Sequence, residues 1–231
     1  MVKYGKHWAL VGCMLAGSPS FAECRLALLL ALDVSSSVDA NEDDLQRQGL
    51  ARALVSNQVV DAFLSVPGTT VALGVYEWSG RYQQTVVLPW MQIDTAADLQ
   101  KASNVIAGSG REFMEFPTAI GYSLGYASSM FAKAPKCWAQ TLDVSGDGRN
   151  NEGFKPKLAY RNFPLRDVTV NGLTIGGQED RLAEYYREEL IKGPGSFVLE
   201  AQDFQDFERA MGMKLVKETS AIAISQMLHH P

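Results

Sequence analysis

Short apolar runs of strand length alternate along the chain with longer segments whose apolar residues recur at helical spacing. Residues 25–33 are almost entirely apolar, as expected of a parallel strand that is covered on both faces of a sheet. The same pattern predicts further strands at 70–79, 84–90, 140–145, 168–175 and 196–200, and helices at 41–64, 95–107, 118–132, 180–192 and 204–218. This alternation predicts a three-layer α/β domain with a mostly parallel sheet.

One pair of predicted strands departs from the parallel arrangement. Segments 70–79 and 84–90 are joined only by a short turn at Gly80 and Arg81. A parallel crossover needs a dozen or more residues, so this link predicts one antiparallel strand beside the parallel ones. In such folds, ligands bind at the carboxyl ends of the parallel strands.

Composition and charge narrow the class of function. The chain has 231 residues, of which 46% are hydrophobic and 20% charged, and its formal net charge is −5. It carries no basic block that would follow a phosphate backbone, so we expect no nucleic-acid partner. Its three histidines, His7, His229 and His230, all lie outside the predicted domain. A histidine general base inside the fold is therefore excluded.

The N-terminal segment has the pattern of a secretory signal peptide. Lys3 and Lys6 precede the apolar stretch 8–16, and small residues around Ala22 predict cleavage after that residue. The apolar stretch is shorter than the roughly 20 residues that span a bilayer, and it leaves too little sequence before Cys13 for a lipoprotein signal. We therefore expect a signal peptide at 1–22, one domain at 23–220 and a tail at 221–231, in a protein that is exported to the periplasm or secreted and has no transmembrane segment after cleavage.

Two cysteines remain after cleavage, and each precedes an apolar strand. Cys24 lies nine residues before Asp33, and Cys137 lies ten residues before Asp147. If the two strands are parallel neighbours in register, both thiols meet at the same end of the sheet, and an oxidising compartment favours a disulfide. Two unpaired buried thiols are the alternative.

Three short motifs stand where predicted strands end or helices begin. Asp33-Val34-Ser35-Ser36-Ser37 closes the first strand, Thr118 begins a helix, and Asp147 follows the strand 140–145. Each motif alone is also typical of turns and helix caps. Their combination and order resemble the metal-ion-dependent adhesion site of von Willebrand factor type A domains.

That resemblance implies both a fold and a ligand set. The implied fold is a Rossmann-like sheet that is parallel except for one antiparallel edge strand. The implied metal ligands are Asp33, Ser35, Ser37, Thr118 and Asp147, with hydroxyls binding directly and an aspartate often acting through water. The ion is a divalent cation, Mg²⁺ in the first place, with Mn²⁺ or Ca²⁺ as alternatives. Because few protein charges neutralise it, the resemblance implies that it binds an Asp or Glu carboxylate from a protein partner.

The likeness extends over residues 24–218 and points to a bacterial branch. Tyr76-Glu77-Trp78-Ser79, Asn171-Gly172-Leu173 and Gly193-Pro194-Gly195 resemble a bacterial family of exported type A proteins that has no established function. One departure concerns the segment before Thr118, which is usually glycine-rich and here reads Glu115-Phe116-Pro117. Whether Glu112 or Glu115 joins the metal stays open at this point.

Other readings of these carboxylates are less favoured. A calcium loop starting at Asp143 would place Phe154 where the bidentate glutamate belongs, so we expect Asp143 on its strand and away from the metal. Asp39, two residues past Ser37, is expected to cap a helix or to be solvated. The sequence therefore predicts a metal-dependent protein-binding module and not an enzyme. The alternative is a metal-dependent hydrolase or phosphoryl-transfer enzyme that uses the same carboxylates.

Overall fold

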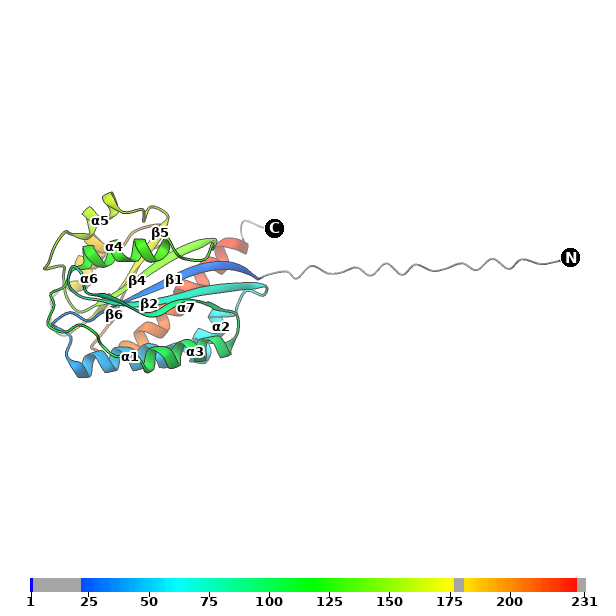
Figure 1. Cartoon of the computed structure of the whole chain (residues 1–231), viewed down its shortest axis with the longest axis horizontal. Coiled ribbons are helices and arrows are strands. Elements are labelled where there is room, and N and C mark those ends of the chain that lie inside the picture. Colours follow the sequence, from blue (N-terminus) through cyan, green and yellow to red (C-terminus); the bar gives the residue numbers. More distant parts are fainter. Residues whose placement is uncertain (2–21, 177–180, 228–231) are drawn as a thin grey trace.

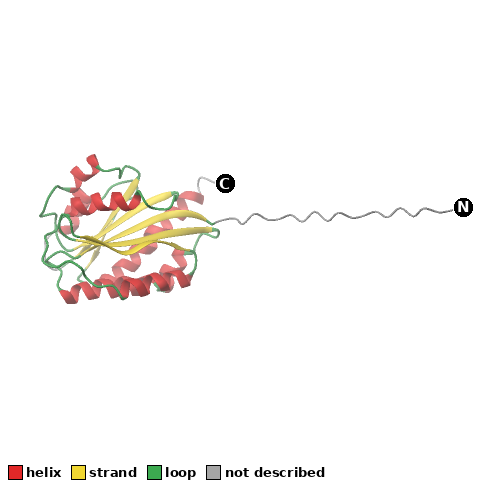
Figure 2. Ribbon diagram, viewed as in Figure 1, coloured by secondary structure: helices red, strands yellow, loops and turns green. Residues whose placement is uncertain are grey.

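A six-stranded sheet lies between two layers of helices (Figures 1 and 2). The computed structural model describes Met1 and residues 22–176 and 181–227. The strands are β1 (Glu23–Asp33), β2 (Thr69–Trp78), β3 (Gln84–Ile93), β4 (Ala139–Gly146), β5 (Val168–Ile175) and β6 (Val198–Ala201).

The strand order is β3-β2-β1-β4-β5-β6. Neighbouring strands pair in parallel, except that the edge strand β3 runs antiparallel to β2. The predicted fold class, including its single antiparallel edge strand, is therefore confirmed. The central strand β1 has β2 on one side and β4 on the other, and this places the carboxyl ends of β1 and β4 next to each other.

Helices cover both faces of the sheet. One layer contains α1 (Ala40–Leu54), α2 (Asn57–Phe63), α3 (Ala96–Ala107) and α7 (Phe207–Met227); the other contains α4 (Ile120–Phe131), α5 (Pro156–Asn162), α6 (Leu182–Tyr185) and the π-helical turn η1 (Tyr186–Leu190). Alternate residues of β1 serve the two cores, with Leu28 and Leu30 in one and Leu29 and Ala31 in the other. Burial on both faces explains why β1 is apolar without alternation.

Two predicted helices differ from the observed elements, and one observed helix was not predicted. The segment 41–64 forms two helices, because the chain turns at Val55 and Ser56, whose amides bond to Arg52 and Ala53 carbonyls. The segment predicted at 180–192 begins outside the described residues and divides into α6 and η1. The short helix α5 was not predicted, since its seven residues are too few to show a periodic pattern.

Cys24 and Cys137 form a disulfide, as the spacing of the two cysteines predicted. Leu26 of β1 pairs with Ala139 of β4, so the segments that carry the cysteines meet at the amino ends of both strands. The bridge joins cysteines that are 113 residues apart in sequence, at the amino ends of β1 and β4. Asp33 lies at the opposite, carboxyl end of β1.

The two chain ends extend past the described parts of the structure. The predicted signal peptide falls on residues 2–21, which lie outside the described residues. The predicted tail starts at residue 221, where the backbone of α7 continues as a helix to Met227; residues 228–231 lie outside the description. Within the described ranges, none of the helices combines the length and the apolar character needed to cross a membrane.

Candidate metal centre

The turn after β1 is built around the carboxylate of Asp33. Asp33 is fully buried, and its Oδ1 accepts a hydrogen bond of 2.8 Å from the amide of Ser35. Its own carbonyl accepts a bond of 3.0 Å from Nε2 of Gln46 on α1. The strand end is therefore closed by an Asx-type turn that directs Ser35 and the residues after it back toward β4.

A chain of hydroxyl groups joins the predicted ligands. Thr118 Oγ1 donates to Ser35 Oγ at 3.1 Å, and Ser35 Oγ lies 3.2 Å from Ser37 Oγ. Ser37 Oγ in turn donates to Asp147 Oδ1 at 2.7 Å. The structure thus brings all five predicted residues together at the carboxyl edge of the sheet, although three separate segments of the chain supply them.

Gly146 allows the two aspartates to approach one another. A Cβ atom at this position would lie 2.7 Å from Asp33 Oδ2 and 2.7 Å from the hydroxyl of Tyr186. Both side chains are buried, so neither can move away at low cost. A glycine is therefore required immediately before Asp147.

Thr118 is held by the loop that follows β4. The sequence predicted that Thr118 begins a helix, but α4 begins at Ile120, and Thr118 occupies the approach to it. Its amide donates to Asn151 Oδ1 at 2.9 Å, while its carbonyl accepts from the amides of Asn151 and Glu152. Asn150 Oδ1 accepts from the amide of Gly121 in the first turn of α4. The segment after Asp147 thereby positions the Thr118 hydroxyl.

The electrostatics of the site are those of two acids confined together. The pKa of Asp33 is raised to about 8, first by burial and then by the charge of Asp147, against the lowering effects of its hydrogen bonds with Ser35 and of the charge of Arg111. Burial without a cation disfavours the charged carboxylate. The arrangement therefore favours a bound positive charge.

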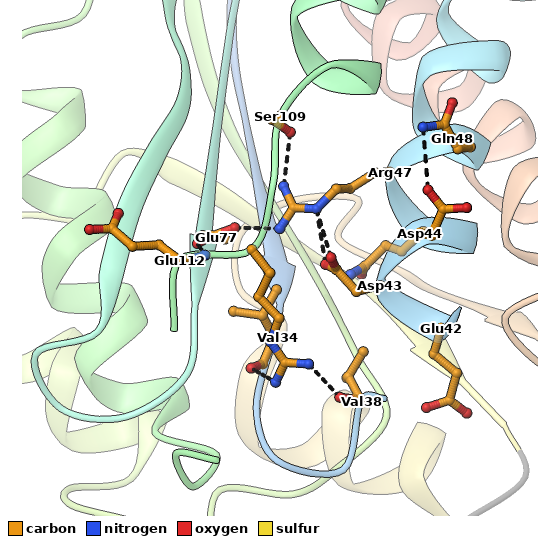
Figure 3. Close-up of polar contacts among 12 residues, drawn as sticks. Val34, Val38, Glu42, Asp43, Asp44, Arg47, Gln48, Glu77, Ser109 and Glu112 are labelled. Atoms are coloured by element: carbon orange, nitrogen blue, oxygen red, sulfur yellow. Dashed lines mark hydrogen bonds and ion pairs between the residues drawn. The ribbon is translucent and has the colours of Figure 1, made fainter. Parts of the chain in front are cut away.

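The remaining acids near the motif have other partners, with the exception of Glu115. Glu112 accepts a hydrogen bond of 2.6 Å from Thr85 Oγ1, and its side chain points away from Glu77 and Arg47 (Figure 3). Glu115 is exposed and has a left-handed backbone with φ of 63°. Asp39 caps α1 by accepting from the amides of Asn41 and Glu42. Asp143 lies on β4, as predicted, 3.0 Å from Lys214 Nζ.

Sequence reasoning missed the residues that support this site. Asn151 and Gln46 contact Thr118 and Asp33 through the backbone, and Arg111 donates to backbone carbonyls of the Asp33–Ser37 turn. The consecutive Asn150 and Asn151 after Gly148 were a usable signal, because asparagine side chains commonly bond to nearby backbone. Gln46 and Arg111 left no comparable pattern in the sequence.

A protein-family model matches most of the chain. The family described as "Protein of unknown function (DUF1194)" matches residues 23–223. The chain belongs to the DUF1194 family. A search of curated proteins gives no match for this DUF1194 chain.

Solved structures share the fold of this DUF1194 chain. Proximal thread matrix protein 1 of the mussel byssus, with a zinc-occupied MIDAS motif, has a TM-score of 0.61 and 18% identity over 86% of this chain and 48% of its own. A von Willebrand factor type A protein of Catenulispora acidiphila has a TM-score of 0.56 and 17% identity over 87% and 43%. BatB of Bacteroides thetaiotaomicron has a TM-score of 0.58 and 17% identity over 85% and 99%. The DUF1194 chain spans about half the length of the first two, and the similarity identifies its fold as the von Willebrand factor type A fold.

The donor set in the DUF1194 chain fits a hard divalent cation. Mg²⁺ prefers oxygen ligands and usually keeps several waters. The site offers two carboxylates and three hydroxyls, and Asp33 Oδ2 is buried with no hydrogen-bond partner among the described residues. No group of three or more His, Cys, Asp or Glu residues in the described ranges could hold a metal, so hydroxyl oxygens and waters would have to complete the coordination of a cation at this site.

Proposed function

We propose that this protein is an exported, metal-dependent binding module that recruits an Asp or Glu side chain of a protein partner. The observation that carries the proposal is the hydroxyl chain from Thr118 through Ser35 and Ser37 to Asp147, set against the buried Asp33. The proposed ligands of the cation, Mg²⁺ in the first place, are Asp33, Ser35, Ser37, Thr118 and Asp147.

The balance of charge supports recruitment of an acid. Asp33 and Asp147 together bring two negative charges, and the three other donors are neutral. A divalent ion there would supply a Lewis-acidic position for an incoming carboxylate. Ser37 is only partly buried, and Ser36 beside it is exposed, so this side of the turn is open to a partner. The hydroxyls would orient the site, while surrounding loops would supply most of the contact area.

Export is supported by two independent features. The disulfide between Cys24 and Cys137 is of a kind that persists in oxidising compartments. The N-terminal residues carry the charge and apolar pattern of a signal peptide. We propose the periplasm or the exterior as the location, and we propose binding instead of catalysis because the domain at 23–220 has no histidine.

The cation is tested by calorimetry on the domain without its N-terminal segment. We expect Mg²⁺ and Mn²⁺ to bind the wild type and not Asp33→Ala. The matched control is Asp39→Ala, which removes a nearby acid and the cap of α1 and should cost about 1 kcal/mol of stability without changing metal affinity. Equal binding by wild type and Asp33→Ala would show that the site is wrongly assigned.

The carboxylate is tested separately on the Mn²⁺-loaded protein. Water relaxation reports the waters on bound Mn²⁺, so displacement of one water by a ligand lowers the enhancement. We expect a short blocked peptide containing Glu to lower it at millimolar concentration, and the same peptide containing Gln to leave it unchanged. Equal effects of both peptides would contradict carboxylate recruitment. Metal-dependent turnover of a phosphoester or a peptide, lost in Asp33→Ala, would instead establish the enzyme alternative.

A further inference from the structure

Arg111 donates hydrogen bonds to the backbone of the turn that carries the candidate ligands Asp33, Ser35 and Ser37. Its guanidinium donates to the carbonyls of Val34 at 2.6 Å, Ser35 at 3.0 Å and Val38 at 2.6 Å. Nε donates to the carbonyl of Phe113 in its own segment at 2.7 Å. One planar side chain thus connects three carbonyls of residues 34–38 with the segment between α3 and α4.

The segment that carries Arg111 is itself anchored on a buried ion pair. Arg47 and Glu77 are both buried and bonded to each other at 2.5 Å (Figure 3). Arg47 Nη1 donates to Ser109 Oγ at 2.9 Å, and Glu77 Oε1 accepts from the amide of Glu112 at 3.0 Å. Ser109 and Glu112, on either side of Arg111, are therefore bonded to α1 and β2. These bonds fix the backbone from which the Arg111 side chain extends.

The Asp33–Ser37 turn also donates a hydrogen bond back to the segment that carries Arg111. The amide of Ser36 donates to the carbonyl of Phe116 at 2.8 Å, two residues before Thr118. The segment 108–117 thus accepts one hydrogen bond from the Asp33–Ser37 turn, and its Arg111 donates three hydrogen bonds to carbonyls of residues 34–38. The relative placement of Ser35 and Thr118 depends on this exchange.

We propose that Arg111 is a positioning residue, which holds the Asp33–Ser37 turn in its metal-binding shape; this inference rests on the proposed function of the site. Serine and threonine hydroxyls are neutral ligands, so their contribution depends on being held in place before the ion arrives. Residues that orient metal ligands typically change affinity by roughly 10- to 100-fold when replaced. Arg111 contacts the backbone of the turn and is not itself a ligand.

The shape of the guanidinium separates this role from a simple effect of charge. Lysine keeps the positive charge near Asp33 but presents a single compact ammonium, which cannot bridge carbonyls on three residues and Phe113 together. We therefore expect Arg111→Lys and Arg111→Gln to lose Mn²⁺ affinity to a similar extent, about tenfold or more. A role of charge alone predicts wild-type affinity in Arg111→Lys.

Arg25 provides a matched control near the amino end of β1, at the end of the strand opposite to Asp33. It is buried, and its guanidinium also donates to three backbone carbonyls, those of Ala62, Phe63 and Thr219. We expect Arg25→Gln to lower stability without changing Mn²⁺ affinity. If that variant does not fold, Arg52→Gln, which breaks an exposed ion pair with Glu208, takes its place.

The experiment combines Mn²⁺ titration with amide hydrogen exchange of the metal-free protein. Under the proposal, both Arg111 variants exchange faster at residues 34–38 while the central strand β1 stays protected, and Arg25→Gln leaves residues 34–38 unchanged. Wild-type affinity in Arg111→Lys, with unchanged exchange in this turn, would overturn the proposal. A wild type that binds no metal would refute the proposed function instead, and exchange would still decide whether Arg111 holds the turn.

Discussion

The Ser37 hydroxyl donates a 2.7 Å hydrogen bond to Asp147 Oδ1 and so joins two turns that lie 110 residues apart in sequence. One turn follows β1 and the other follows β4. The bond places a neutral donor and an acid of the candidate site in direct contact. It also leaves Asp147 close enough to Asp33 for their charges to interact.

Asp147→Asn should separate stability from metal binding. In the metal-free protein at pH 9, above the Asp33 pKa of about 8, the substitution removes a like charge beside an ionised Asp33, and the amide oxygen can still accept from Ser37. We expect the free energy of unfolding to rise by about 1 kcal/mol, the scale of one pKa unit. Adding Mg²⁺ should stabilise the wild type and not the variant. Urea denaturation with and without Mg²⁺ tests this, and an equal shift by Mg²⁺ in both proteins would contradict it.

Gly146→Ala should damage the site by steric contact alone. The new methyl group would lie 2.7 Å from Asp33 Oδ2, so the carboxylate or the backbone has to shift. We expect a loss of about 1–3 kcal/mol in stability, together with at least a tenfold loss of Mn²⁺ affinity. Gly110→Ala is the control, since a Cβ there meets no atom within 4 Å. Unchanged Mn²⁺ affinity in Gly146→Ala would show that Asp33 does not ligate the ion.

Lys214→Met should strongly destabilise the fold. Lys214 is fully buried on α7, 3.0 Å from Asp143 Oδ1 and 2.7 Å from Glu218 Oε1. Removing this cation leaves two buried carboxylates without their partner, at a cost of about 3–5 kcal/mol. The exposed Lys133→Met serves as control, and chemical denaturation measures both. Adding Asp143→Asn to Lys214→Met should restore part of the loss, and failure to do so would contradict a charge-based cause.

Replacing both Cys24 and Cys137 by serine should lower stability without touching the metal site. The bridge closes a loop of 113 residues, and removal of such a bridge typically costs about 2–5 kcal/mol. Because the bridge lies at the amino ends of β1 and β4, Mn²⁺ affinity should stay at the wild-type value. Reductant should destabilise the wild type to the same extent and leave the double variant unchanged. A change in Mn²⁺ affinity would show that the two edges are coupled.

Much of the fold could be predicted because its signals are local. The unbroken apolar run before Asp33 marked a strand buried on both faces, and the short link at Gly80 marked the antiparallel edge. The pairing of Cys24 with Cys137 followed from the register expected of two parallel neighbours, which the structure has. Helix ends were less accurate, since the break at Val55 is made by hydrogen bonds from Val55 and Ser56 to the carbonyls of Arg52 and Ala53 and is not marked by a proline or glycine.

The sequence by itself determined which residues were candidates for the site, because Asp33, Ser35, Ser37, Thr118 and Asp147 follow recognisable strands or precede a helix, in an order that resembles the metal-ion-dependent adhesion site. Only the tertiary structure decided how those residues are held. Arg111 and Gln46 act on backbone carbonyls, and any residue type can supply a backbone carbonyl, so neither contact has a sequence signature. The contact of Glu112 was likewise a tertiary outcome, since its side chain bonds to Thr85 on β3, an edge strand 27 residues earlier. Local patterns record the chemistry of single residues, whereas their positioning comes from contacts between segments that only the folded chain brings together.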